Sequence, residues 1–155
     1  MRSLGLDIGG KRTGVAISDP QGILAIPLTV IANGSEDATI DDVIKLAQQH
    51  QVGRIVIGLP RSLDGSLNQQ ANKVTAFANK LSHRLTYNPS PFKGEGKSEG
   101  GRKIDIRLWD ERLSTVAAEK LMVEAGTKKN KRKQHRDAIA AAFILQGFLD
   151  SLKAC

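Results

Sequence analysis

Apolar and polar residues alternate in two short segments near the start of the chain. In residues 3–8 (SLGLDI) and 14–18 (GVAIS), apolar side chains occupy every second position, and a Gly-Gly-Lys-Arg turn lies between the segments. A period of two is typical of half-buried strands. The pattern therefore predicts a β-hairpin over residues 3–19.

Three later segments also have strand-like patterns. Residues 23–31 (ILAIPLTVI) are β-branched and apolar, although Pro27 removes one backbone donor and so favours an edge strand or a bulge. Residues 54–58 (RIVIG) form a continuous apolar run, which is typical of a strand buried on both faces. Residues 104–109 (IDIRLW) alternate again. Together with the hairpin, these segments predict five strands.

Helical spacing of apolar residues separates these strands. Residues 36–51 have this spacing, with Ser35 or Asp37 as the N-cap, and Ser66 with Gln69 forms a capping-box pattern for a helix to about residue 82. A third helix is predicted from Ser114 or Thr115 to about residue 125, and a fourth over 134–152. The apolar stripe of the fourth helix consists of Ala141, Ile144, Leu145 and Phe148.

Length and composition indicate one globular domain over residues 1–155. Residues 86–103 are rich in Pro, Gly, Ser, Lys and Glu, so we expect a flexible surface insertion within that domain. Because the only cysteine is Cys155, no intrachain disulfide can form, and a reducing compartment is expected. No apolar run has membrane-spanning length, so the expected location is the cytoplasm, with no membrane partner.

The charge balance favours a polyanionic partner. The chain has 23 Lys and Arg against 16 Asp and Glu, a formal net charge of +7 and a pI near 9.8. Aromatic residues make up 4% of the chain, too few for the stacking platforms that read single-stranded bases. We therefore expect recognition of backbone and shape, through the basic residues Lys11, Arg12, Arg61, Arg112, Lys131, Arg132, Lys133 and Arg136.

Three acidic positions lie at the ends of predicted elements. Asp7 is in the first strand, Asp110 and Glu111 follow the last strand, and Asp137 heads the apolar stripe of the last helix. Each has a simpler explanation, namely a turn hydrogen bond, a surface ion pair and the helix dipole. If the three acids converge, their oxygens would suit one or two Mg²⁺ or Mn²⁺ ions, which activate water in phosphodiester hydrolysis.

Four ordered motifs resemble the YqgF family, also called RuvX, whose members are similar to the Holliday junction resolvase RuvC. The motifs are LGLDIGGKRTGVAISD, IVIGLPRSLDGS, DERLST and KRKQHRDAIAAAFILQGFL. The resemblance covers nearly the whole chain outside the expected insertion. It implies an α/β RNase H-like fold, a mixed five-stranded sheet with helices on both faces, and a cytoplasmic nuclease that processes the 5′ end of pre-16S rRNA.

The resemblance also assigns the site. The family acids correspond to Asp7, Glu111 and Asp137 as catalytic metal ligands, with Asp110 left open as the alternative to Glu111. In RuvC-type resolvases, the second acid follows the strand that corresponds here to residues 55–58, and this chain has Gly-Leu-Pro there. Thr13 is a candidate to orient Asp7 or the substrate.

Other functions remain open from the sequence. The segment DIGGKRTG also resembles the phosphate-binding hairpin of actin-like sugar kinases and ATPases, which need two lobes where 155 residues provide one. A Holliday junction resolvase acting on branched DNA and a nucleic-acid-binding protein without catalysis are also compatible with the sequence. No dimerisation stripe is evident, so a monomer or a weak homodimer is expected.

Overall fold

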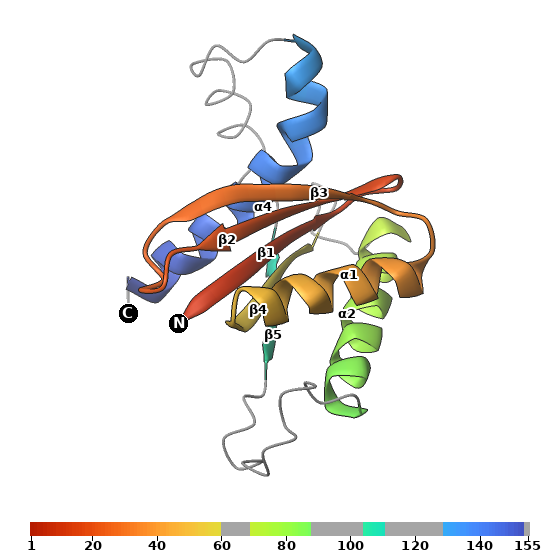
Figure 1. The fold of residues 1–155 in the computed structure, drawn as a ribbon, viewed down its shortest axis with the longest axis horizontal. Coiled ribbons are helices and arrows are strands. Elements are labelled where there is room, and N and C mark those ends of the chain that lie inside the picture. Colours follow the sequence, from red (N-terminus) through yellow and green to blue (C-terminus); the bar gives the residue numbers. More distant parts are fainter. Residues whose placement is uncertain (60–68, 88–103, 111–128, 154–155) are drawn as a thin grey trace.

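The computed structural model describes residues 1–59, 69–87, 104–110 and 129–153 (Figure 1). Its five strands form one mixed sheet in the order β3-β2-β1-β4-β5. Neighbours β3, β2 and β1 pair antiparallel, whereas β1, β4 and β5 pair parallel. The strands are β1 (Arg2–Ile8), β2 (Arg12–Ser18), β3 (Ala25–Ala32), β4 (Val52–Leu59) and β5 (Asp105–Asp110). The predicted five-stranded mixed sheet is confirmed.

Three described helices cover both faces of this sheet, as predicted. Helices α1 (Glu36–Gln49) and α2 (Gln69–Tyr87) pack on one face, and α4 (Lys129–Lys153) packs on the other (Figure 1). Ser35 is the N-cap of α1, because its hydroxyl accepts a hydrogen bond from the Ala38 N–H at 3.1 Å. No helix within the described ranges is long and apolar enough to cross a membrane.

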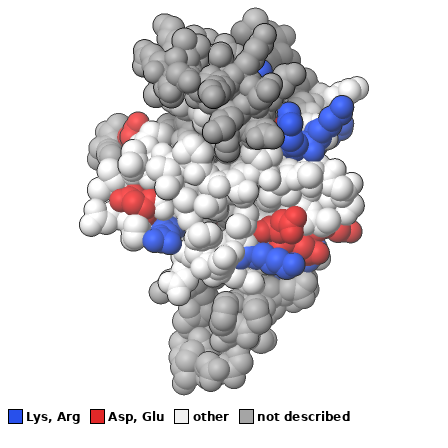
Figure 2. Space-filling model, turned by 45° about the horizontal axis from the view of Figure 1, so that its top comes forward, with Lys and Arg blue, Asp and Glu red and all other residues white. Residues whose placement is uncertain are grey.

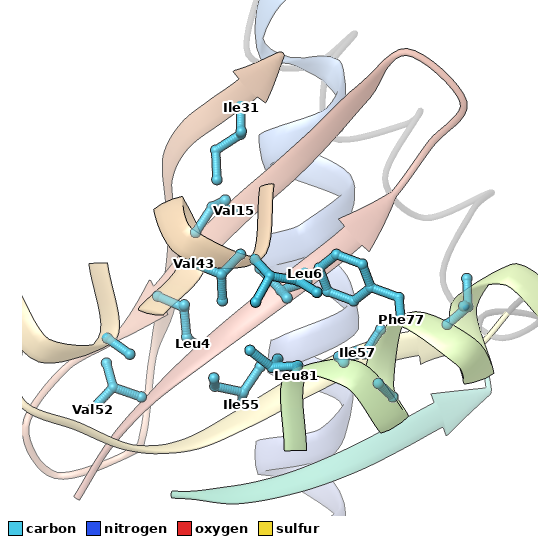
Figure 3. Packing of buried hydrophobic residues seen from close by; sticks show 14 of the residues in the cluster. Leu4, Leu6, Val15, Ile31, Val43, Val52, Ile55, Ile57, Phe77 and Leu81 are labelled. Atoms are coloured by element: carbon cyan, nitrogen blue, oxygen red, sulfur yellow. The ribbon is translucent and has the colours of Figure 1, made fainter. Parts of the chain in front are cut away.

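Side chains alternate between the two faces of the sheet along each strand, so each face has its own hydrophobic core. Leu4 and Leu6 of β1 and Ile57 of β4 face α1 and α2, where they are completely buried. Figure 3 shows Phe77 and Leu81 of α2 pointing toward these strand residues. Full burial of a side chain of this size contributes about 1.5–3 kcal/mol, so this core supplies much of the stability of the fold.

The other face of the sheet has a glycine in its central strand, which lets α4 lie directly on it. A Cβ added to Gly5 of β1 would be 2.7 Å from the Leu145 Cβ and 2.9 Å from the Ala141 oxygen. The stripe predicted for this helix is confirmed, since Ala141, Ile144, Leu145 and Phe148 are all buried. The glycine therefore sets the close approach of the helix to the sheet.

Pro27 has the role that its sequence position predicts. Strand β3 is an edge strand, and its register against β2 shifts between Val15 and Ala16, where Pro27 faces Ala16. A missing N–H costs least at an edge or a bulge, and both features are present.

Helix boundaries differ from the prediction in several places, and α1 ends at Gln49 instead of residue 51. Helix α4 begins at Lys129 instead of residue 134, so most of the basic run 128–133 is helical and does not precede the helix. Lysine, arginine and glutamine have good helix propensity, which allows the helix to extend N-terminally without an apolar stripe. Helix α2 continues to Tyr87, so residues 86 and 87 belong to it. The rest of the expected insertion and the helix expected near 114–125 lie outside the described residues.

An ion-pair network at the start of β5 makes part of the stability depend on pH. The guanidinium of Arg107, at 2.8 Å, and that of Arg54, at 3.3 Å, hold the pKa of Asp105 below its ordinary value of 3.8. A lowered folded-state pKa stabilises the protein above pH 4, and this contribution disappears as the pH falls through the lowered value. We expect Asp105→Asn to lower the free energy of unfolding by about 0.5–1 kcal/mol at pH 7. In urea titrations, the difference from wild type should shrink as the pH falls below 4; a constant difference would contradict the electrostatic origin.

Candidate metal and nucleic-acid site

Asp7 lies at the carboxyl end of β1, on the α4 face of the sheet. Asp7 and Gly5 are two positions apart in the strand, so both are on the same face of the sheet, and Gly5 packs against α4. Its partner across the antiparallel pair is Gly14 of β2. The end of β1 is also tied to α2, because the Gln70 side-chain amide donates to the Ile8 carbonyl at 3.0 Å. The strand end that carries this carboxylate is therefore held by β2 and by α2.

The backbone of Asp137 lies directly on Gly14. A Cβ added to Gly14 would be 1.9 Å from the Asp137 carbonyl oxygen, a distance that no side chain could occupy. Since Gly14 is paired with Asp7, the two acids are on the same face of the sheet at neighbouring positions. The backbone of residue 137 therefore lies on the strand partner of residue 7. Gly14 itself was missed, although a glycine inside a strand signals a close backbone approach.

A second glycine flanks Asp7 on the other side. Gly58 of β4 comes directly after the Ile57 that pairs with Leu6, and it is paired with Trp109 of β5. The residues next to Asp7 on the two flanking strands are therefore both glycines, Gly14 of β2 and Gly58 of β4. Trp109 is on the α4 face, where its ring meets Phe148 edge to face at 5.9 Å between centroids.

Arg12 connects the hairpin turn to the second acid. Its Nε is 3.3 Å from the Asp137 Oδ2, and the two side chains are 50% and 28% exposed. Figure 2 shows Lys and Arg side chains grouped at one edge of the molecule, apart from the mixed charges elsewhere on that face. The guanidinium of Arg12 is therefore close to one acid and also open to a solvent-borne phosphate.

Asn33 fixes the turn that carries Arg12. Its N–H donates to the Lys11 carbonyl at 2.9 Å, and its side-chain amide donates to the Gly9 carbonyl at 3.0 Å. Its side-chain oxygen accepts from the Thr13 hydroxyl at 2.9 Å. The role expected for Thr13 beside Asp7 is therefore wrong, because the Thr13 side chain is buried and its strand parity is opposite to that of Gly14. No local pattern revealed Asn33, which follows the end of β3.

The structure also separates Asp110 from Asp7. Asp110 pairs with Leu59, whose side chain belongs to the core under α1 and α2. Side chains paired across adjacent strands share a face, so Asp110 is on the face opposite Asp7. This leaves Glu111, which lies outside the described residues, as the third acid expected from the resemblance.

The two described acids fit a hard divalent cation. Both offer carboxylate oxygens, the ligands that such cations prefer, although Asp137 is paired with the guanidinium of Arg12. Within the ranges that the structure describes, no three His, Cys, Asp or Glu side chains gather into a metal-binding group. The described residues therefore include two of the three acids that the resemblance assigns, Asp7 and Asp137.

The remaining basic candidates are placed only in part. Lys11 is exposed in the same turn as Arg12, and Arg136 is exposed on α4 one residue before Asp137. Arg61 and Arg112 lie outside the described residues. The backbone positions of Lys131, Arg132 and Lys133 are in α4, but their side chains are outside the described set.

The fold is shared with known Holliday junction resolvases. RuvC of Thermus thermophilus in complex with a Holliday junction superposes with a TM-score of 0.59 at 15% identity, over 99% of this chain and 96% of that chain. The fowlpox virus resolvase in complex with its substrate junction superposes with a TM-score of 0.51 at 13% identity, over 98% of this chain and 99% of that chain. At these identities, the similarity establishes the fold, which is that of the RuvC-like resolvases.

Sequence comparison identifies closer relatives. A protein of Clostridium botulinum named "Putative pre-16S rRNA nuclease" is 41% identical over 98% of both chains. A protein of Pelotomaculum thermopropionicum with the same name is 41% identical over 97% of this chain and 88% of its own length. The profile of the RuvX family, described as Holliday junction resolvase, matches residues 1–151. The chain therefore belongs to the RuvX family, within the RNase H-like fold of the RuvC resolvases.

Proposed function

We propose that this protein is a cytoplasmic, Mg²⁺-dependent (or Mn²⁺-dependent) endonuclease that hydrolyses phosphodiester bonds in the 5′ precursor segment of 16S rRNA. The observation that supports the proposal is that the backbone of Asp137 lies on Gly14, the strand partner of Asp7, on the face of the sheet that Asp7 shares with Gly5. The names of the 41%-identical relatives support the RNA substrate. The single cysteine of the chain supports the reducing compartment.

In this proposal, Asp7, Asp137 and Glu111 hold the metal. When bound, the cation lowers the pKa of a coordinated water and neutralises charge that develops on the phosphate. Asp7 has the central position, because it lies between two glycines at a strand end that α2 and β2 both hold. Rigid placement of a carboxylate reduces the entropy that is lost when substrate and metal are brought together.

Basic residues around the acids would hold the polyanion. Lys11 and Arg12 are on a turn whose backbone is fixed by Asn33, so their charges stay beside the acids. Arg136 on α4, and by proposal Arg61, Arg112, Lys131, Arg132 and Lys133, would extend this contact. Each phosphate that a cation neutralises releases condensed counterions, so we propose that binding weakens steeply with salt.

Cleavage of four-way DNA junctions is the second candidate function. It is favoured by the description of the RuvX family and by the fold shared with RuvC. A resolvase that cuts two symmetric strands would need two active sites, whereas trimming a single-stranded rRNA precursor needs one. A monomer or weak homodimer, which we propose, is therefore consistent with an RNA substrate.

One experiment separates these functions. The purified chain is incubated with an RNA that carries the precursor 5′ extension of 16S rRNA, or with a four-way DNA junction, in Mg²⁺ and in EDTA. We expect cuts in the RNA extension in Mg²⁺ and none in EDTA. Junction cleavage with intact RNA would support the resolvase instead. RNA binding without cleavage in any divalent metal would reduce the function to nucleic-acid binding.

A further inference from the structure

The ion pair between Arg12 and Asp137 joins the two halves of the proposed site. Asp137 is a proposed metal ligand, and Arg12 is a proposed phosphate contact, yet the structure has them bound to each other at 3.3 Å. One guanidinium has five N–H donors in a planar fork, more than one carboxylate can accept. The ion pair therefore engages both groups but leaves other N–H donors of the Arg12 guanidinium available to a second acceptor.

The geometry of the turn allows this arginine to change partners. The backbone of Arg12 is fixed, because its carbonyl accepts from the Gly9 N–H at 2.9 Å and Asn33 binds the adjacent Lys11 carbonyl. The side chain, in contrast, is 50% exposed. Only side-chain torsions must change for the guanidinium to leave Asp137, and an exposed ion pair opposes that change weakly.

We propose that Arg12 is a positioning residue whose guanidinium exchanges between Asp137 and a phosphate of the nucleic acid. This inference rests on the proposed function, since it needs a divalent cation at Asp7 and Asp137. A cation bound there competes with Arg12 for the same carboxylate and repels its charge. The released guanidinium then binds a phosphate through paired N–H···O hydrogen bonds. Metal and nucleic acid thus strengthen each other's binding, as linkage requires.

The exchange predicts a specific non-additive effect without any metal. In EDTA, Asp137→Asn removes the competing carboxylate, so a dye-labelled single-stranded RNA 12-mer should bind about two- to fivefold more tightly by fluorescence anisotropy. In an Arg12→Gln background, the same Asp137→Asn change should alter the affinity by less than about 1.5-fold. Cleavage does not interfere, because EDTA removes divalent ions.

Lys11 provides the matched control. It is exposed in the same turn and has the same charge, and no ion pair to Asp137 is recorded for it in the described structure. In a Lys11→Gln background, Asp137→Asn should still tighten RNA binding about two- to fivefold. If Asp137→Asn changed the RNA affinity equally in the Arg12→Gln and Lys11→Gln backgrounds, the exchange would be overturned. The loss of one negative charge would then explain the effect without any specific pairing with Arg12.

A second readout uses the metal alone. Titration of Mn²⁺ followed by electron paramagnetic resonance should show a higher Mn²⁺ affinity for Arg12→Gln than for wild type, by about two- to fivefold. Lys11→Gln should raise that affinity less than Arg12→Gln does, because the ion pair to Asp137 is made by Arg12, and Arg12→Lys, which keeps a charge at the position, should remain near wild type. Thermal unfolding followed by circular dichroism confirms that each variant is folded.

The outcomes distinguish this inference from the function on which it rests. If Arg12→Gln weakens Mn²⁺ binding, Arg12 is a fixed support for Asp137 and the exchange is wrong, while the metal site remains. If wild-type protein binds Mn²⁺ but the effects of the Arg12 and Asp137 substitutions on RNA affinity are additive, only the exchange fails. If wild-type protein binds no Mn²⁺, the metal-dependent nuclease and the exchange fail together.

Discussion

Replacing Asp7 with asparagine is expected to abolish Mg²⁺-dependent cleavage while leaving RNA binding largely intact. Asparagine has nearly the same shape, so the strand end and its pairing with Gly14 should be preserved. The substitution removes the negative charge that would hold the cation, and metal catalysis contributes several kcal/mol of transition-state stabilisation. We therefore expect the single-turnover cleavage rate to fall by at least about a thousandfold.

The control for this variant is Asp42→Asn. Asp42 is exposed on α1, which packs on the opposite face of the sheet from α4. The charge change is the same, but the cleavage rate should stay within about twofold of wild type. RNA affinity, measured in EDTA, should not decrease for either variant, since each loses a negative charge. Full cleavage by Asp7→Asn would place the catalytic centre elsewhere.

Adding a single methyl group at Gly14 is expected to disrupt both the fold and the site. The new Cβ of Gly14→Ala would lie 1.9 Å from the Asp137 carbonyl oxygen and 2.7 Å from the Ala138 nitrogen. These are backbone atoms, so relief requires α4 to move away from the sheet. Overpacking of this kind costs about 1–3 kcal/mol or more, and the shift would also separate Asp137 from Asp7. Urea unfolding and Mg²⁺-dependent cleavage should both be strongly affected.

Gly34→Ala is the corresponding control for glycine replacement. A Cβ at Gly34 would have no heavy atom within 4 Å, and this residue is exposed in the turn between β3 and α1. Its replacement should leave stability unchanged or raise it by about 0.4–1 kcal/mol through the unfolded state. A Gly14→Ala protein as stable as wild type would show that α4 is not held against β2 in solution as the structure has it.

Several features followed from local patterns in the sequence. The period of two predicted the hairpin, and the run RIVIG predicted a strand that is buried on both faces. The stripe from Ala141 to Phe148 predicted the inward face of α4, with Asp137 at its head. These predictions succeeded because burial of apolar side chains depends on the spacing of residues along one element.

Other features were decided only when the elements packed together. The approach of Asp137 to Asp7 depends on Gly14, the partner of Arg12 depends on where α4 crosses the hairpin, and Asn33 reaches the turn from the end of β3. The face of Asp110 depends on the register between β4 and β5. Such contacts join residues far apart in sequence, and local spacing does not encode the distance between elements. The sequence therefore determined which residues could act, and the tertiary structure decided which of them meet.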